Sequence, residues 1–441
     1  MEMSPRLPHL AQCLALVACL LGIRLSALDA VPPPRIQSDE HLLEEIERAA
    51  FEYFRVEANP INGLVRDRST PQSKCSIAAV GFGLSAWCIG VERGYVGRKE
   101  AAVRVQSTLA TFLNGPQGPA AEGTIGHRGW FYHFLEMESG HRAWKCELSS
   151  IDTALFLAGA LDASRFFDGP DPVERSLRRM SDALLARVDW RWMCDGTDVL
   201  SMGWYPEKGF IPRCWVGYNE GMLLYLLALG APKHPLPPTA WQGWTRGYLW
   251  KTNHAQAYLD FPPLFGHQYS HCWIDFRGQS DAWMRSRGID YFENSRRAVL
   301  AQQAYCIANP SGHLGYGPHL WGITACDGPD GYGARGAPPA EHDDGTIAPT
   351  AVVASVPFAP EICLPTLRHI HDQWGQRLWT RYGYRDAFNP SRDWVATDVL
   401  GIDQGAMLVM IENYRTGSVW RRMMGHPVIR RGLKRAGFRK D

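Results

Sequence analysis

The sequence has no excess of charge of either sign. Its 441 residues include 46 Lys and Arg against 45 Asp and Glu, a formal net charge of +1. A chain without a basic excess lacks the electrostatic footprint of a nucleic-acid binder, so we expect no nucleic acid as a partner. Hydrophobic residues make up 45% and charged residues 21%, which excludes a disordered chain and provides for a sizeable core.

The sequence also lacks the cysteine patterns of a zinc site or a disulfide scaffold. Nine of the eleven cysteines lie beyond residue 30, an odd number, and no CxxC or Cys/His cluster with zinc spacing occurs. Most, such as Cys88, Cys272 and Cys306, fall within apolar helical runs and are predicted to be buried thiols. We expect neither a metal nor a cofactor.

No stretch beyond the N-terminus is long and apolar enough to span a membrane. Residues 1–30 are typical of a signal peptide, with Arg6 before an apolar run and small residues before residue 31. Leu16-Val-Ala-Cys19 also resembles a lipoprotein cleavage box, so Cys19 is a candidate lipid anchor. We expect a periplasmic or secreted protein.

Strand-like alternation is nearly absent from the rest of the chain. After a proline-rich linker (31–38) and an amphipathic helix (39–58), apolar small-residue helices alternate with amphipathic ones. The pairs are 76–93 with 99–113, 149–167 with 173–188, 219–230 with 239–249, 267–285 with 290–307, 346–355 with 361–374, and 402–414 with the C-terminal basic helices.

Helices that are apolar all round belong inside a fold, and amphipathic ones outside. Six such pairs predict an all-α fold, an (α/α)6 barrel with an inner and an outer ring, in a single domain over residues 39–441. An open helical solenoid shows a similar alternation of apolar and amphipathic helices and is the alternative interpretation. In a closed barrel, the long loops before the inner helices gather at one mouth.

Three carboxylates share one placement at the starts of inner helices. Glu147 precedes the Ser149-x-x-Asp152 capping box, Glu220 follows the N-cap candidate Asn219, and Asp403 opens the last inner helix. Acidic residues favour first helical turns for dipole reasons alone. In a closed barrel they converge, and glycoside hydrolysis needs two carboxyl groups on either side of the scissile bond.

Seventeen Trp and sixteen Tyr are many for this length and suggest a ligand bound through flat apolar faces. The following aromatic and polar residues near the acids are expected to bind substrate: Trp130, Tyr132, Asp152, Tyr218, Asn219, His271 and Trp321.

His267-x3-His271-x3-Asp275 places three metal-ligand types on one helical face. Because Arg277 and Asp281 continue the polar pattern, we favour a wall that binds sugar hydroxyls over a metal site. The Gly-rich loop 327–345, with Arg335 and Asp344, is either flexible filler or a substrate lid.

Gly81-Phe-Gly-Leu-Ser-Ala86 matches a dinucleotide fingerprint, GxGxxA, but no βαβ unit surrounds it. We expect its glycines to let inner helices pack closely.

Long motifs resemble one known family: VGFGLSAWCIGVERG, W-x-CELSSIDTALFLAGAL, GYNEGMLLYLLALG, PLFGHQYSHCWIDFRG, GIDYFENSRRA, WGITACDGP, DDGTIAPTA and GIDQGAMLVMIENYRTG. From about Phe51 to about Trp420 the chain resembles the glycoamylase-like family, which includes glycoside hydrolase family 144, the bacterial β-1,2-glucanases. The resemblance implies a single (α/α)6 domain and a metal-independent hydrolase of β-1,2-glucan. It further implies an inverting enzyme, either endo-acting or releasing sophorose, although a related transglycosylase branch retains configuration.

The resemblance also suggests roles for the acids. The acid of the family's Glu-Leu-Ser-Thr motif falls on Glu147, with Ser150 here in place of Thr, and that of its Tyr-Asn-Glu motif falls on Glu220, with Gly221 in place of Ala. We expect Glu220 to be the general acid. Asp403 is the candidate base and Glu147 the alternative, because water activation in the family can run through an intervening hydroxyl.

The leading prediction is a monomeric glycoside hydrolase that cleaves β-1,2-glucan or its oligosaccharides. The alternatives are a retaining β-1,2-glucan transglycosylase, a non-catalytic periplasmic glucan-binding protein, and a metal-dependent enzyme that uses His267, His271 and Asp275.

Overall fold

The computed structural model describes residues 31–440, so the predicted signal peptide and Cys19 lie outside the described residues. The helices are α2 (Asp39–Val56), α3 (Ile77–Glu92), α4 (Arg98–Asn114), α5 (Ser150–Phe166), α6 (Pro172–Arg187), α7 (Met222–Gly230), α8 (Thr239–Thr245), α9 (Phe265–Trp273), α10 (Ala282–Arg285), α11 (Tyr291–Ala308), α12 (Pro349–Val353), α13 (Pro360–Leu378), α14 (Gly401–Arg415), α15 (Ser418–Met424) and α16 (Pro427–Arg435), with 3-10 turns η1 (Trp192–Cys194) and η2 (Pro390–Arg392). The short strands are β1 (Cys75–Ser76), β2 (Gly126–His127), β3 (Trp130–Phe131), β4 (Phe134–Leu135), β5 (Leu148–Ser149), β6 (Gly203–Tyr205), β7 (Gly209–Phe210), β8 (Trp250–Asn253), β9 (Gln256–Leu259), β10 (Gln279–Ser280), β11 (Ala325–Cys326), β12 (Gly333–Ala334), β13 (Trp379–Thr380), β14 (Gly383–Tyr384), β15 (Phe388–Asn389), β16 (Trp394–Val395) and β17 (Arg439–Lys440).

Six helices form the inner ring, in the order α3, α5, α7, α9, α12 and α14. Almost every residue of these helices is buried, as their apolar sequences predict. Hydrogen bonds join neighbours around the ring: Leu223 N donates to Ser270 Oγ between α7 and α9, and Gln268 Nε2 donates to Ala351 O between α9 and α12. Helix α14 packs on both α12 and α3, which closes the circle. The predicted (α/α)6 barrel is confirmed.

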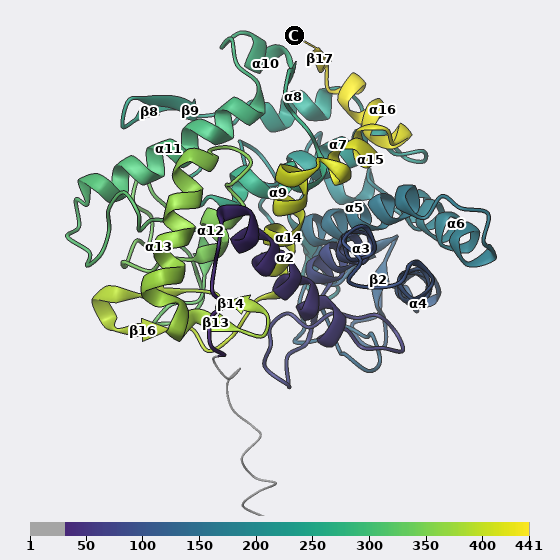
Figure 1. Cartoon of the computed structure of the whole chain (residues 1–441). Helices are drawn as coiled ribbons and strands as arrows, with labels where there is room; N and C mark the ends of the chain where they lie inside the picture. The colour runs from purple at the N-terminus through teal and green to yellow at the C-terminus, as the bar shows by residue number, and fades with distance from the viewer. Residues whose placement is uncertain (1–30, 441) are drawn as a thin grey trace, which may run out of the picture.

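The outer ring lies around these helices, with α4 and α6 on one flank and α11 and α13 on the other (Figure 1). One predicted pairing is wrong. The outer partner of α14 is α2 rather than the C-terminal helices, because α2 presents a continuous buried face that includes Leu42, Leu43, Ile46 and Ala50. The short C-terminal helices instead cover the rear ends of the inner ring, and α16 packs on α7.

Glycines let the inner helices approach closely, as expected of the GxGxxA stretch. A Cβ on Gly159 of α5 would lie 1.8 Å from the carbonyl oxygen of Gly81 in α3, and one on Gly81 would lie 2.3 Å from Leu155 O. No methyl group fits at such distances, so the α3–α5 contact is a backbone-to-backbone contact.

Three predicted elements differ from the observed ones. The segment 267–285 is not one helix: α9 ends at Trp273, a turn at Gly278 (φ +61°) follows, and Asp281 caps the separate α10. Helix α7 begins at Met222 rather than Asn219, and α12 has only five residues.

The inner helices begin at the same end of the barrel, which we call the mouth. Short antiparallel hairpins line it, such as β5–β6–β7 and β11–β12, and hold the loops before α5 and α12. Residues 31–38, predicted as a linker, lie against the barrel: Val31 N donates to Trp379 O (3.1 Å), and His371 Nε2 lies 2.9 Å from Pro34 O.

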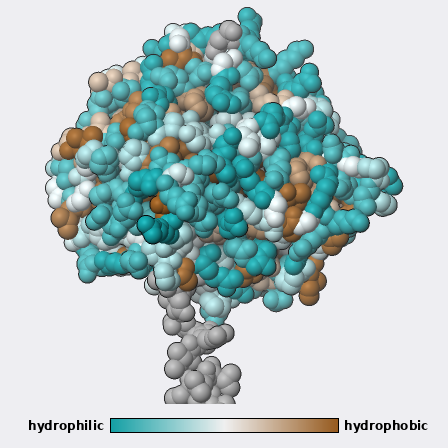
Figure 2. All heavy atoms as spheres, in the orientation of Figure 1, coloured by the Kyte–Doolittle hydropathy of each residue, from teal (hydrophilic) through white to brown (hydrophobic). Residues whose placement is uncertain are grey.

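The surface in Figure 2 is mostly hydrophilic, with hydrophobic side chains in small separate groups. Within residues 31–440, no helix is long and apolar enough to cross a membrane.

The close approach of α3 and α5 makes a stability prediction. We expect Gly159→Ala to lower the free energy of unfolding by about 1–3 kcal/mol, because the methyl group forces two buried helices apart. Denaturant unfolding followed by circular dichroism measures the change. The control is Gly317→Ala, where the nearest atom to an added Cβ is 3.8 Å away. Equal stability of the two variants would contradict backbone contact between the helices.

Candidate active site

The loop before α5 holds a carboxylate–histidine cluster at the mouth. Glu147 lies immediately before β5, and its Oε1 is 2.9 Å from His133 Nδ1. The other imidazole nitrogen, Nε2, lies 3.6 Å from Asp152 Oδ2. Ser149 caps α5 by accepting a hydrogen bond from Asp152 N (3.2 Å), and its hydroxyl also contacts the Asp152 carboxylate. The Ser149 half of the predicted capping box is present, and the Ser149 hydroxyl holds the Asp152 carboxylate beside His133.

Opposite charges set the ionisation of this cluster. Burial lowers the pKa of His133, but the charges of Asp152 and Glu147 outweigh it and raise the pKa to about 9. Burial raises the pKa of Glu147, yet the hydrogen bond and charge of His133 hold it below its usual value. His133 is therefore a cation and Glu147 an anion at neutral pH.

Glu220 lies in the turn that leads into α7. Asn219 accepts a hydrogen bond from Gly221 N (2.9 Å) and shapes this turn, and Ser270 Oγ donates to Glu220 O (2.9 Å). Glu220 Oε2 is buried and has no hydrogen-bond partner among the described residues. Burial, together with the charge of Asp152, raises the pKa of Glu220 to about 7. This carboxyl can hold a proton at neutral pH.

Asp403, at the start of α14, forms a carboxyl pair with Asp386. Both are buried, and burial raises both pKa values, that of Asp403 to about 7 and that of Asp386 well above its usual value. Asp386 Oδ2 accepts a hydrogen bond from Asp327 N (2.6 Å), and the Asp386 carboxyl is hydrogen-bonded to that of Asp403. A proton on Asp386 lets it donate to Asp403, which then stays ionised. Tyr269 also hydrogen-bonds Asp403.

Arg68 pairs with three further carboxylates of this region. Its Nη1 lies 3.2 Å from Asp327 Oδ2 and 3.7 Å from Asp398 Oδ2, and its Nε lies 3.5 Å from Asp67 Oδ2. Carboxylates far outnumber cations at the mouth, so protons as well as cations must neutralise them.

The order of the inner ring sets which acids face one another. Glu220 precedes α7 and Asp403 opens α14, and these helices are three positions apart in a ring of six. Glu147, before the neighbouring α5, lies on the same side as Glu220.

Several predicted substrate-binding aromatics lie in the core instead. Trp130 and Trp321 are fully buried and donate their indole N–H to Asp189 O (3.0 Å) and Thr366 Oγ1 (2.8 Å). Tyr132 is also fully buried. The prediction was wrong for these rings because sequence proximity to an acid does not fix the direction in which a side chain points.

Tyr218 and His271 are likewise internal. Tyr218 stacks parallel to Tyr291, and its hydroxyl lies 3.3 Å from Ser295 Oγ, which is 3.1 Å from His271 Nε2. Burial lowers the pKa of His271 to about 3, so the imidazole is neutral. His267 has the same lowered pKa, also from burial.

The polar pattern after α9 lies at the rear of the barrel, so its predicted role in substrate binding is wrong. Asp275 forms a bidentate pair with Arg277 (2.8 and 2.7 Å), which lies over the Trp420 ring. Asp281 caps α10 and accepts a hydrogen bond from Trp241 Nε1 (2.8 Å). Because α9 ends at Trp273, Asp275 does not share a helical face with the two histidines. Among the described residues, no group of three or more His, Cys, Asp or Glu is placed to hold a metal ion.

Arg335 and Asp344 lie in the mouth loop but bind each other. The Arg335 guanidinium contacts both Asp344 oxygens at 3.0 Å and donates to Cys326 O (2.7 Å). Arg335 is buried, so it holds the 327–345 loop from within.

Sequence reasoning missed His133, Asp386, Arg68, Tyr269 and Tyr332. His133 stands in a run of aromatics, and Asp386 lies in a loop with no helical pattern. Their roles depend on contacts between segments far apart in the chain, for which a single sequence gives no signal.

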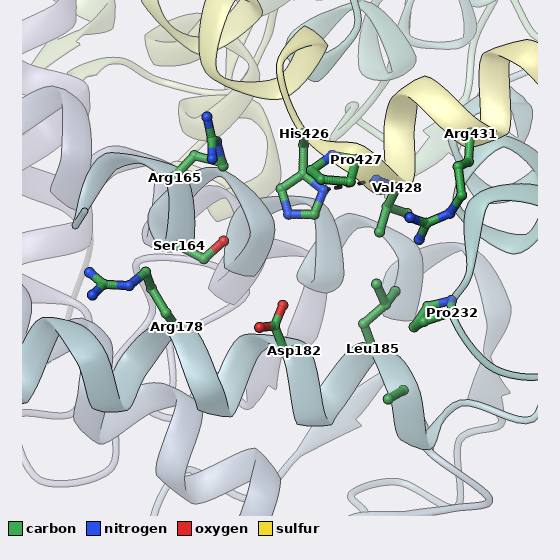
Figure 3. A pocket seen from close by; sticks show the side chains of 11 residues that line it. Ser164, Arg165, Arg178, Asp182, Leu185, Pro232, His426, Pro427, Val428 and Arg431 are labelled. Atoms are coloured by element: carbon green, nitrogen blue, oxygen red, sulfur yellow. Dashed lines mark hydrogen bonds between the residues drawn. The ribbon is translucent and has the colours of Figure 1, made fainter.

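A hollow of about 460 Å³ lies at the rear of the barrel (Figure 3). It is bordered by Ser164 and Arg165 of α5, about 20 Å from the start of that helix at 1.5 Å per residue. Asp182 is the only carboxylate among its lining residues, which also include Arg178 and Arg431. A single carboxylate does not meet the need of glycoside hydrolysis for two, so the acids at the mouth form the candidate active site.

Comparisons with known proteins identify relatives of this chain. The Glycoamylase family model matches residues 213–427. A crystal structure of a "putative glucoamylase" from Bacteroides uniformis has 32% sequence identity to this chain and superposes on it with a TM-score of 0.85. The match covers 92% of this chain and 99% of the Bacteroides chain. The chain belongs to the glycoamylase-like family.

Two further members of this family have names that state a substrate. An endo-β-1,2-glucanase from Chitinophaga pinensis, solved with sophorotriose and glucose, is 28% identical, with 92% of this chain and 99% of that chain covered and a TM-score of 0.84. An exo-β-1,2-glucooligosaccharide sophorohydrolase from Parabacteroides distasonis is 31% identical over 437 residues, 90% of this chain. This chain spans 58% of the length of that curated relative.

The position of the His133 imidazolium between Glu147 and Asp152 predicts that the stability of the protein depends on pH. Because the folded pKa of His133 is raised to about 9, its stabilisation is complete below about pH 6.5 and is lost as the pH rises through 9. We expect His133→Gln to lower the free energy of unfolding by about 1.5–3 kcal/mol at pH 6 and by little at pH 10. Urea unfolding at both pH values measures this, and an equal loss at both would contradict a charged His133.

Proposed function

We propose that this chain is a glycoside hydrolase that cleaves β-1,2-linked glucans by single displacement, with Glu220 as general acid. The buried Glu220 carboxyl, with its pKa near 7 and an unpartnered oxygen, is the observation that carries this proposal. A general acid must hold its proton at the working pH and release it to the leaving oxygen, which an exposed glutamate does not do. The names of the two glucan-hydrolysing relatives support the substrate class.

We assign Asp403 as the base that activates water. Asp403 opens the inner helix three positions away from the one that Glu220 precedes, and an inverting enzyme uses two carboxyl groups about 6.5–9.5 Å apart, which leaves room for a water molecule between them. Asp386 takes the proton of the carboxyl pair and leaves Asp403 free to accept one. Glu147 suits this role less well, because His133 engages its Oε1 and it lies on the same side as Glu220.

The retaining alternative requires two carboxyl groups only about 5–5.5 Å apart. Glu147 and Glu220 precede the neighbouring inner helices α5 and α7 and are the candidate pair for that chemistry. A transglycosylase that uses this pair would keep the anomeric configuration, which the stereochemistry of the product distinguishes.

We also propose that the enzyme works outside the cytoplasm, on the strength of the signal-peptide pattern in residues 1–30. Sequencing the N-terminus of protein from the periplasmic fraction tests cleavage near residue 30. Metabolic labelling with palmitate tests whether Cys19 carries lipid.

The first functional test is the product profile on linear β-1,2-glucan. We expect the wild type to release β-1,2-oligosaccharides with inverted anomeric configuration. Time-resolved optical rotation measures that configuration. Glu220→Gln should lose about 10²–10⁴-fold in kcat, the contribution of a general acid, while keeping its affinity for glucan. Sophorose as sole product would indicate exo action, and mixed oligosaccharides endo action. Absence of any product from the wild type would favour the non-catalytic binding protein and overturn the proposal.

The pH dependence of kcat/KM gives a second test. Glu220 must be protonated and Asp403 ionised, and both have pKa values near 7. We therefore expect a bell-shaped profile centred near neutral pH, falling about tenfold per pH unit on either side. Activity that stays constant from pH 7 to 10 would contradict the acid role of Glu220. Glu100→Gln, whose residue is exposed on the outer helix α4, serves as the matched control.

A further inference from the structure

Exposed aromatic rings are few in this chain. It contains 17 Trp, 16 Tyr and 17 Phe, yet among the described residues only Trp144, Tyr332 and Tyr414 have more than 36% of their surface exposed. Trp144 is 63% exposed and Tyr332 59%, and these two lie at the mouth of the barrel. A large ring left in water forgoes the gain of burial, so its position calls for a reason.

Trp144 is held in place by the loop before α5. Trp144 and Lys145 both adopt left-handed backbone conformations, with φ of +52° and +53°. Such conformations are uncommon for bulky residues and persist where the surroundings impose them. Arg142 fixes the loop by donating to Lys145 O (2.7 Å) and Cys146 O (2.6 Å).

A continuous series of ring contacts leads from Trp144 to the acids. The Trp144 ring lies 5.1 Å from Phe134, and Phe134 stacks on the His133 imidazole at 3.9 Å and 14°. His133 in turn contacts Glu147 at 2.9 Å. Trp144 therefore extends the wall that carries Glu147 outward toward solvent.

Tyr332 occupies the corresponding place in the loop before α12. It directly precedes β12, in the turn whose Gly331 O accepts a hydrogen bond from Arg335 Nη2 (3.3 Å). Although the ring is open to solvent, its hydroxyl lies in the field of Asp403 and Asp386. A side chain that is both solvent-exposed and close to buried carboxyls forms the wall of a cleft.

The two rings lie beside different acids of the mouth. Trp144 belongs to the loop before α5 and connects through Phe134 and His133 to Glu147. Tyr332 belongs to the loop before α12 and lies near Asp403 and Asp386. A sugar chain that extends from the acids toward solvent can therefore meet either ring.

We propose that Trp144 and Tyr332 are two sugar-binding platforms at the mouth, one on the wall that carries Glu147 and the other beside Asp403. This inference rests on the proposed function and adds the residues that would determine how many glucosyl units bind. The axial C–H groups of a glucopyranose ring present an apolar face that packs on an aromatic ring, while its hydroxyls remain solvated at the edge. Both rings are fixed by their loops, so little side-chain entropy is lost on binding.

The test is calorimetric titration of Glu220→Gln protein with β-1,2-gluco-oligosaccharides of two to seven units. Adding Trp144→Ala or Tyr332→Ala should weaken the binding of the longer oligosaccharides by roughly 3- to 10-fold each, the effect of one stacked ring. Trp144→Phe should restore part of the affinity. Tyr414→Ala, which removes the remaining exposed ring, is the matched control and should leave the affinity unchanged.

Kinetics of the single variants in the active enzyme separate binding from folding. We expect Trp144→Ala and Tyr332→Ala to raise KM more for long than for short oligosaccharides and to keep the midpoints of the wild-type pH profile. Unchanged affinity and KM in an enzyme that still hydrolyses glucan would overturn the platforms alone. A wild type that neither binds nor hydrolyses any β-1,2-glucan would overturn the proposed function and the platforms together.

Discussion

The convergence of six helix N-termini at one mouth is the constraint on which the site depends. Each inner helix presents unpaired N–H groups and a partial positive charge at its start. Carboxylates are favoured there, and this barrel supplies them through Glu147, Asp152, Glu220 and Asp403. The same electrostatics that stabilises each helix therefore brings acids together from segments that are distant in the sequence.

Burial then makes these acids different from one another. Where a cation is near, as His133 is to Glu147, the carboxylate stays ionised. Where none is near, as at Glu220, desolvation raises the pKa and the group holds a proton. Where two carboxyl groups meet, as at Asp386 and Asp403, one proton serves both. The arrangement of a few cations among many acids thus separates proton donors from proton acceptors without any metal-ligand geometry among the described residues.

Helical periodicity was enough to predict the barrel, because helices such as α3 and α7 carry apolar residues on every face and must therefore be buried on all sides. The starts of α5 and α14 were also predictable, from the capping box and from the expected first helical turn. The direction of individual rings was not, since Trp130 and Trp144 stand on either side of His133 and one is fully buried while the other is exposed. Asp386 was missed because its importance comes only from its contact with Asp403.

The pairing of α2 with α14 has a consequence for how the chain folds. The first and last long helices of the barrel lie together, and Arg415 of α14 forms ion pairs with Glu40 (2.6 Å) and Glu47 of α2. The sixth helical pair is therefore built from opposite ends of the sequence and cannot form until α14 has been synthesised. Until then, the apolar face of α3 that α14 covers has no partner, so the nascent chain exposes surface prone to aggregation. Folding of this barrel is thus governed by a contact of very high sequence separation, which predicts slow, post-synthetic closure.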